Sequence, residues 1–254
     1  MRSNVEHWQE LQARGYFENH PEYGGMREAG GEESLAAIER FLPLRHEMDV
    51  VVIGCGYGRE TLKIAPHVRI VYGIDVSNII LDKASAFLRS RRVDNFVPVA
   101  YAEYKTVVPQ SVDLVFSIVV MQHITRDLVR DYFRTFSGRL KAGGGMVVQF
   151  LEEQYEGVDK ADAQLEAVEP SVSWTRRQLG SLADYAGLEL ADVHTQQVTP
   201  TALWHWTYFI ARGHRRAARK PDRTPHSAVP SPAAALNLFP LGETRVTPAG
   251  SPEI

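Results

Sequence analysis

Residues 50–58 constrain the fold of this 254-residue chain more than any other stretch. Residues 50–53 are four aliphatic side chains in a row, a pattern typical of a parallel strand that is covered on both faces. Gly54, Gly56 and Gly58 follow at alternate positions, and glycine allows the sharp turns and close backbone approach that a ligand-binding loop needs. Residues 59–65 have helical character and stop at Pro66. The order of strand, glycine loop and helix predicts a nucleotide-type site at the carboxyl edge of a doubly wound sheet.

The spacing of these glycines indicates which kind of ligand to expect. A dinucleotide fingerprint would need a third glycine at position 59, where the chain has Arg59. A second predicted strand, residues 68–75, ends in Asp75, whose carboxylate can accept hydrogen bonds from both hydroxyls of a ribose. This combination resembles the class I S-adenosylmethionine-dependent methyltransferases, whose motif I has the form of residues 51–58. The resemblance implies S-adenosyl-L-methionine as the cofactor, held by Gly54, Cys55, Gly56, Gly58 and Asp75.

The rest of the pattern predicts the fold. Helices and strands alternate at the pace of parallel βαβ units. We expect helices at residues 34–42, 77–91, 125–140 and 175–187, and further strands at 96–100, 111–117, 146–150, 188–198 and 203–212. Residues 141–145 should stop the third of these helices, and 151–173 should be irregular. The predicted fold class is α/β, a doubly wound, mostly parallel seven-stranded sheet with helices on both faces and a C-terminal antiparallel strand pair.

Composition divides the chain into three parts. Residues 1–33 are rich in aromatics and interrupted by glycine. They are predicted to form a lid or cap over donor and acceptor, as in the family that the chain resembles, or alternatively to pack on the sheet edge. Residues 34–213 should form the S-adenosylmethionine-binding domain. Residues 214–254 mix Arg, Pro, Ala and Ser, and such a composition predicts a disordered tail.

Charge and cysteine content exclude several classes of function. The net charge is −3, and because residues 214–254 carry +3, the body carries −6, which argues against a nucleic-acid-binding domain. The single Cys55 excludes an internal disulfide and a cysteine metal cluster. Apolar runs fall short of the roughly 18 residues of a membrane span, so we expect a cytoplasmic protein with no membrane contact. The expected partner is a small-molecule acceptor, and the sequence leaves the oligomeric state open.

The best candidates for chemistry follow the predicted strand 111–117, at the edge where ligands bind in such sheets. Gln122 and His123 stand there, and imidazole titrates near neutral pH. We therefore interpret His123 as the candidate general base for a hydroxyl acceptor. The alternative is that His123 fixes its loop through hydrogen bonds. Fallback candidates for the base are His20, His194 and His205.

The resemblance extends to other positions around the cofactor. It implies contacts from Val76, Tyr101, Ala102, Ser117 and Gln122. At Tyr101 the sequence departs from the family, which usually has an acid at the adenine, so Glu103 or a backbone carbonyl is expected to make that contact instead. Candidate acceptor-binding residues are Tyr16, His20, Tyr23, Glu152 and Trp204, with core packing as the alternative for the aromatics.

Other acceptor chemistries lack their usual residues here. Residues 117–120 do not carry the Pro-Pro-aromatic motif of enzymes that methylate base amines, and Cys55 lies in the cofactor loop rather than at a nucleophile position. Asp113, Asp127 and Asp131 are explained by helix and cap roles, so no metal is predicted. The sequence favours O-methylation of a sugar or natural-product hydroxyl. The alternatives are an N- or C-methyltransferase of a metabolite and a non-catalytic donor-binding scaffold.

Overall fold

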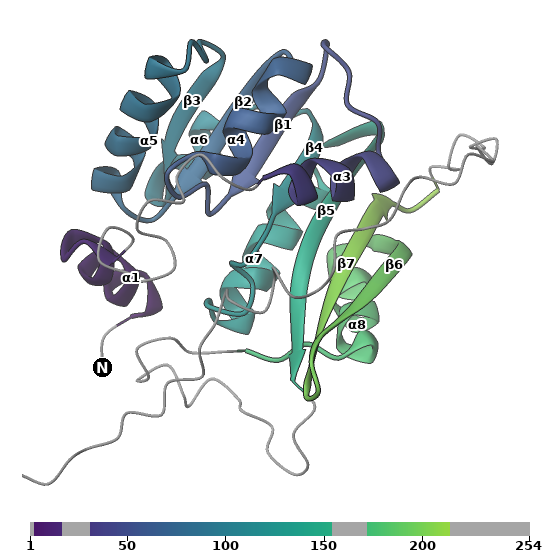
Figure 1. The fold of residues 1–254 in the computed structure, drawn as a ribbon. Helices are drawn as coiled ribbons and strands as arrows, with labels where there is room; N and C mark the ends of the chain where they lie inside the picture. The colour runs from purple at the N-terminus through teal and green to yellow at the C-terminus, as the bar shows by residue number, and fades with distance from the viewer. Residues whose placement is uncertain (1–2, 17–30, 154–171, 214–254) are drawn as a thin grey trace, which may run out of the picture.

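The computed structural model describes residues 3–16, 31–153 and 172–213. Its centre is a seven-stranded sheet with the order β3-β2-β1-β4-β5-β7-β6 (Figure 1). The first five strands are parallel, β7 is antiparallel to β5, and β6 is antiparallel to β7. This confirms the predicted fold class and its C-terminal antiparallel pair. The strands are β1 Asp49–Ile53, β2 Ile70–Asp75, β3 Phe96–Ala100, β4 Val112–Ser117, β5 Leu140–Glu153, β6 Leu188–Thr199 and β7 Ala202–Ala211.

Helices cover both faces of the sheet, and one helix lies at its carboxyl edge (Figure 1). The first face carries α3 Glu32–Phe41, α4 Arg59–Ile64 and α5 Asn78–Ser90, and the second carries α6 Tyr104–Val107, α7 Arg126–Ser137 and α8 Arg176–Ala186. Two 3₁₀ turns are η1 Ala65–His67 and η2 Tyr101–Glu103. The N-terminal helix α1, Asn4–Ala13, lies beside the carboxyl ends of the strands. The N-caps of α5, α7 and α8 are Ser77, Thr125 and Thr175, and each side chain accepts a backbone N–H of its own first turn.

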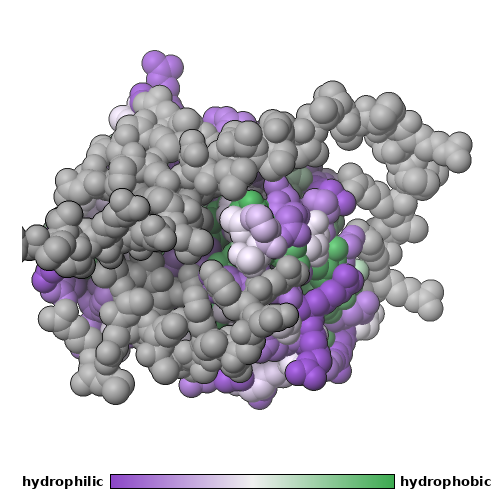
Figure 2. All heavy atoms as spheres, turned by 60° about the horizontal axis from the view of Figure 1, so that its bottom comes forward, coloured by the Kyte–Doolittle hydropathy of each residue, from purple (hydrophilic) through white to green (hydrophobic). Residues whose placement is uncertain are grey.

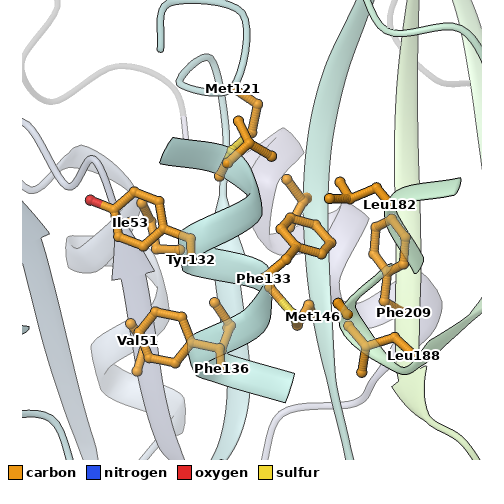
Figure 3. Packing of buried hydrophobic residues seen from close by; sticks show 14 of the residues in the cluster. Val51, Ile53, Met121, Tyr132, Phe133, Phe136, Met146, Leu182, Leu188 and Phe209 are labelled. Atoms are coloured by element: carbon orange, nitrogen blue, oxygen red, sulfur yellow. The ribbon is translucent and has the colours of Figure 1, made fainter. Parts of the chain in front are cut away.

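The sheet separates two hydrophobic clusters, as a strand that is buried on both faces requires. Figure 3 shows the cluster under α7 and α8, where the rings of Phe133 and Phe209 meet edge to face at 4.9 Å between centroids. Val51 and Ile53 point into this cluster, whereas Val50 and Val52 point into the other. The strand that leads into the glycine loop is therefore fixed from both sides.

Charged side chains close the opposite, amino edge of the sheet. The Lys141 ammonium lies 2.7 Å from Asp113 Oδ2 and 3.3 Å from Asp49 Oδ2. Asp113 Oδ2 also accepts the Asp49 N–H at 2.8 Å, and Arg69 pairs with the buried Asp49. Carboxylates and cations thus hold the starts of β1, β4 and β5 together. Among the described residues, no helix has the length and apolar content that crossing a bilayer requires.

The prediction for residues 137–153 was wrong about where the helix ends and the strand begins. Helix α7 ends at Ser137 with Gly138 as its C-cap, and β5 already starts at Leu140. The buried Arg139 guanidinium donates to Val108 O and Lys105 O, and this holds the chain at the helix exit. The glycines of the run 141–145 serve strand packing rather than a helix stop: a Cβ at Gly144 would lie 2.5 Å from Asp113 O. Strand β5 also continues through Glu153, so Glu152 belongs to the strand and not to an irregular segment.

We expect Gly145→Ala to lower the free energy of unfolding by about 1–3 kcal/mol, because forcing an atom into a packed core costs this much. The new Cβ would lie 2.4 Å from the Tyr208 ring and 2.8 Å from Phe209 O. Gly180→Ala in α8 is the matched control, since its Cβ meets nothing within 4 Å and a helical alanine should stabilise by about 0.5–1 kcal/mol. Urea unfolding measures both. Equal destabilisation by the two substitutions would contradict this account of the glycine run.

Candidate cofactor and acceptor site

The glycine loop after β1 adopts the backbone that its sequence predicts. Gly54, Gly56 and Gly58 have φ angles of +67°, +50° and +89°, in the region that favours glycine. The N–H groups of Gly54 and Cys55 both donate to Ile74 O, at 2.8 and 3.0 Å, which turns the loop against β2. A Cβ at Gly54 would lie 2.2 Å from Val120 Cγ2. Glycine at position 54 therefore lets the loop after β4 pack directly on the cofactor loop.

Cys55 contributes its backbone to this loop and a buried side chain, whose Sγ lies 3.9 Å from Gly56 O. Its side chain is buried in the cluster under α4 and α5, against Gly73. Burial raises the pKa of the Cys55 thiol, so the thiol stays protonated at neutral pH. The sequence interpretation of Cys55 as a loop residue rather than a nucleophile agrees with this position.

Asp75 joins the tip of β2 to the glycine loop. Its Oδ2 accepts the Gly56 N–H at 3.1 Å, and its Oδ1 accepts the Ser77 N–H at 3.2 Å. The residue is 6% exposed, and burial raises the pKa of its carboxyl, although the N–H donors act in the opposite direction. The structure thus brings together the two elements that the sequence assigned to the cofactor.

Helix α1 lies against both halves of this edge. Asn4 Nδ2 and Trp8 Nε1 both donate to His123 O, at 3.0 and 2.9 Å. Further along the same helix, Gln9 Nε2 donates to Val76 O at 2.8 Å, and the Gln12 amide lies beside the Asp75 carboxylate, where it acts to lower the pKa of that carboxyl. Sequence reasoning missed these contacts. The one signal for the helix was the capping box of Ser3 and Glu6, which the structure contains.

The loop after β4 carries the predicted base. His123 is 9% exposed, and its ring meets the Trp8 ring edge-on, with 5.3 Å between centroids. Gln122 is buried, and its Oε1 has no hydrogen-bond partner among the described residues. The loop turns at Val119, whose φ of +56° is strained for a β-branched residue. The N–H of Val119 donates to Gln149 Oε1 of β5 at 3.2 Å, which holds this turn.

The end of β5 holds a second polar group at the same edge. His205 Nε2 lies 2.7 Å from Glu152 Oε2, and its Nδ1 lies 2.9 Å from Thr195 Oγ1, so one buried ring links β5, β7 and β6. In the neutral ring, Nε2–H donates to the carboxylate and Nδ1 accepts from the hydroxyl. The segment from Val172 to Trp174 bridges this group to the loop after β4, because Val172 N donates to Gln122 O and Trp174 N donates to Leu151 O.

His194, another of the candidate histidines, lies away from this edge. In the antiparallel pair of β6 and β7, His194 lies opposite Trp206. These two residues face the other side of the sheet from Thr195 and His205. Burial and the nearby Arg40 guanidinium lower the pKa of His194. His20 and Tyr23 lie outside the residues that the structure describes. Of the four histidines that the sequence named, the structure therefore places His123 and His205 at the carboxyl edge.

The remaining predicted residues have mixed positions. Ser117 Oγ donates to Ile53 O at 3.0 Å inside the sheet, and Trp204 is buried. Tyr101 is half-buried, and its ring stacks on Tyr104 at 5.8 Å between centroids. Ala102 in the same turn is exposed. The Tyr16 ring lies edge-on against the Trp8 ring. Asp127 forms an ion pair with Arg130, and Asp131 forms one with Lys105.

The carboxyl edge comes forward in Figure 2. The part of this face drawn in colour shows small hydrophobic areas between hydrophilic ones. The polar groups described above, from Asp75 through His123 to Glu152, belong to this edge of the sheet. It is the position at which doubly wound sheets bind their ligands.

Comparison with known proteins points to one class of fold. A family model described as "Methyltransferase domain" matches residues 51–147, which run from the glycine-loop strand to the middle of β5. A search of curated proteins gave no match. The central part of the chain is thus similar to a methyltransferase domain.

Solved structures show the same fold at low sequence identity. Phosphoethanolamine N-methyltransferase 2 of Haemonchus contortus, in complex with phosphomonomethylethanolamine and S-adenosylhomocysteine, is 17% identical with a TM-score of 0.67, over 83% of this chain and 60% of that one. Magnesium protoporphyrin IX methyltransferase of Synechocystis PCC 6803 with bound S-adenosylhomocysteine is 12% identical with a TM-score of 0.60, over 82% and 100%. The [4+2]-cyclase SpnF is 13% identical with a TM-score of 0.66, over 83% and 97%. This chain therefore spans less than two thirds of the Haemonchus protein.

The residues at the edge fit S-adenosylmethionine. The cofactor presents hydroxyl and ammonium donors, which need acceptors, and the edge offers the Asp75 carboxylate together with buried Oε1 atoms of Gln12 and Gln122 that lack partners among the described residues. The turned glycine loop allows a ligand to approach its backbone closely. Asp75, Gly56 and their neighbours would hold the cofactor.

We expect the affinity for S-adenosylhomocysteine to fall as the pH drops through the raised pKa of Asp75. Ribose hydroxyls donate hydrogen bonds and so favour the ionised carboxylate, whereas burial favours its protonated form at pH values above the ordinary 3.8. Binding in that range should release a proton. Calorimetry in buffers of different ionisation enthalpy measures this release. In Asp75→Asn the binding should be weaker and this pH step should vanish; a step that persists would assign it to another group.

Proposed function

We propose that the chain is an S-adenosylmethionine-dependent methyltransferase that acts on a small molecule, transferring the methyl group to a sugar or natural-product hydroxyl with His123 as the general base. One observation supports this most strongly. The loop that carries Gln122 and His123 packs through Val120 on the cofactor glycine Gly54, so donor and base belong to one edge.

The protein's share of the reaction is mainly alignment. When bound, the cofactor supplies a methyl group that its sulfonium already activates. The chain must hold the donor, orient the acceptor and remove a hydroxyl proton, which is a proximity task plus one proton transfer. The His123 backbone is fixed by the two donors of α1, and its ring rests against Trp8. A ring placed in this way can take the proton without reorganising its loop.

The enclosure of this edge supports a small acceptor. His123 is 9% exposed beneath α1, so only a compact molecule can reach its ring while the helix stays docked. The solved structures of similar fold agree in kind, since two of them are named for small molecules, phosphoethanolamine and magnesium protoporphyrin IX. The fold by itself does not fix the reaction, because the cyclase SpnF shares it.

Methylation of an amine is the second candidate, and the Glu152 carboxylate favours it. Glu152 lies at the same edge, and the His205 ring fixes one of its oxygens. A carboxylate there can attract a cationic amine and hold it. Methyl transfer needs the neutral amine, and Glu152 can itself accept the proton that the cation gives up, so His123 would matter little in that case.

Transfer of radioactive methyl label from S-adenosylmethionine separates these possibilities. The test uses three pools of small molecules: monosaccharides and glycosides, phenols, and primary to tertiary amines. Label in either hydroxyl pool supports the proposal, and label in the amine pool alone supports the second candidate. Binding of S-adenosylhomocysteine with no transfer to any pool would point to a donor-binding scaffold instead.

For a hydroxyl acceptor found in this way, we expect His123→Gln to lower kcat by about 10²–10⁴, the usual contribution of a general base. Glutamine keeps the size of the side chain and its hydrogen bonding but does not titrate. The affinity of this variant for S-adenosylhomocysteine should stay within about twofold of wild type, because the His123 ring does not bind the cofactor in this proposal. The control His67→Gln changes an exposed histidine in η1 and should leave kcat unchanged. An unchanged kcat in His123→Gln would rule out the base.

A further inference from the structure

We propose that Gln12 of α1 is a second ribose-binding residue: its Oε1 accepts a hydrogen bond from a ribose hydroxyl of the donor, while its amide NH₂ orients Asp75. Nothing in the glycine-loop motif points to this residue, because it lies some forty residues before that motif. The inference rests on the donor-binding part of the proposed function and not on the identity of the acceptor.

The inward face of α1 is polar, which is unusual for a docked helix. Asn4, Trp8 and Gln12 recur every four residues and so share one face. Asn4 and Trp8 donate hydrogen bonds across this interface to His123 O, and the Gln12 amide lies beside the Asp75 carboxylate. Gln12 is 5% exposed, yet its Oε1 has no partner among the described residues. Burying an acceptor in this way costs free energy unless a donor reaches it.

The chemistry of the two groups fixes the orientation of the amide. An ionised carboxylate only accepts hydrogen bonds, so the NH₂ group of Gln12 must face Asp75. The carbonyl end of the same amide then points away from the carboxylate. The result is two acceptors side by side, the Asp75 carboxylate and Gln12 Oε1. This arrangement matches the two neighbouring hydroxyl donors of a ribose.

Asp75 alone has little capacity left for a ribose. A carboxylate offers about four lone-pair sites. Donors already directed at Asp75 are the N–H groups of Gly56, Val76 and Ser77 and the amide of Gln12. A ribose that used only this carboxylate would have to displace them. Gln12 Oε1 supplies an acceptor that needs no such displacement, so we assign one hydroxyl to Gln12 and the other to Asp75.

A chemical double-mutant cycle tests this assignment. Calorimetry measures the affinity of the full chain for S-adenosylhomocysteine and for its 2′-deoxy and 3′-deoxy derivatives, in wild type and in Gln12→Met. Methionine keeps the length and helix propensity of glutamine but neither donates nor accepts strongly. In wild type, removing the ribose hydroxyl that donates to Gln12 Oε1 should weaken binding about tenfold, which is the effect expected of one buried hydrogen bond. In Gln12→Met, the parent ligand should bind about tenfold more weakly, and removing that hydroxyl should change nothing further.

Gln9→Met is the matched control on the same helix. Gln9 is exposed and donates to Val76 O, so it helps to dock α1 without an acceptor directed at a ribose. This variant should change the affinity for all three ligands by one common factor. If Gln12→Met does not fold, Gln12→Asn serves the same cycle, since it withdraws the oxygen by one methylene and keeps the amide.

The outcomes separate the inference from the function on which it rests. If wild type does not bind S-adenosylhomocysteine, the proposed function fails. If wild type binds it, but both deoxy derivatives lose the same affinity in wild type and Gln12→Met, the ribose is held without Gln12 and the inference is overturned. Loss of discrimination for one hydroxyl in Gln12→Met, but not in Gln9→Met, supports it.

Discussion

The carboxylate of Asp75 is the contact on which the functional edge depends. It accepts the Gly56 N–H of the loop after β1 and the Ser77 N–H at the start of α5, so it joins two neighbouring βα units at their shared end. Burial works against the charged form, and the surrounding N–H donors favour it. A ligand that adds a hydrogen-bond donor shifts this balance toward the ionised state. The group that shapes the loop is therefore also the group whose protonation such a ligand would change.

Close backbone approach connects this contact to the acceptor side. Val120 packs on the Cα of Gly54. The preceding residue, Val119, has a strained backbone, and its N–H donates to Gln149 Oε1 of β5. Strain of this kind persists only where the surroundings enforce it, and it is common beside active sites. At the opposite edge of the sheet, ion pairs among Asp49, Asp113 and Lys141 hold the starts of the strands.

The sequence predicted the elements whose signal is local. Residues 50–58 and Asp75 could be interpreted because a buried strand, a glycine turn and a strand-end acid each have a pattern of their own. The glycines at 144 and 145 led to a wrong prediction, because glycines occur both where a helix stops and where a strand is closely packed. Here the second case holds, since Asp113 and Tyr208 leave no room for side chains at these positions. His205 on β7 contacts Glu152 on β5 and Thr195 on β6, and no spacing along the chain reveals such a contact.

Helix α1 shows why the contacts between the N-terminal segment and the carboxyl edge were not predicted from the sequence. Hydrophobic periodicity is the usual signal of a docked helix, and α1 docks through Asn4, Trp8 and Gln12 instead. Hydrogen bonds of this kind contribute little net stability each, because water competes for the same groups when the helix is undocked. A helix that docks through such bonds is held less firmly than one that docks through an apolar seam of the same length, and it also lacks the periodic pattern by which such a seam is recognised in a sequence.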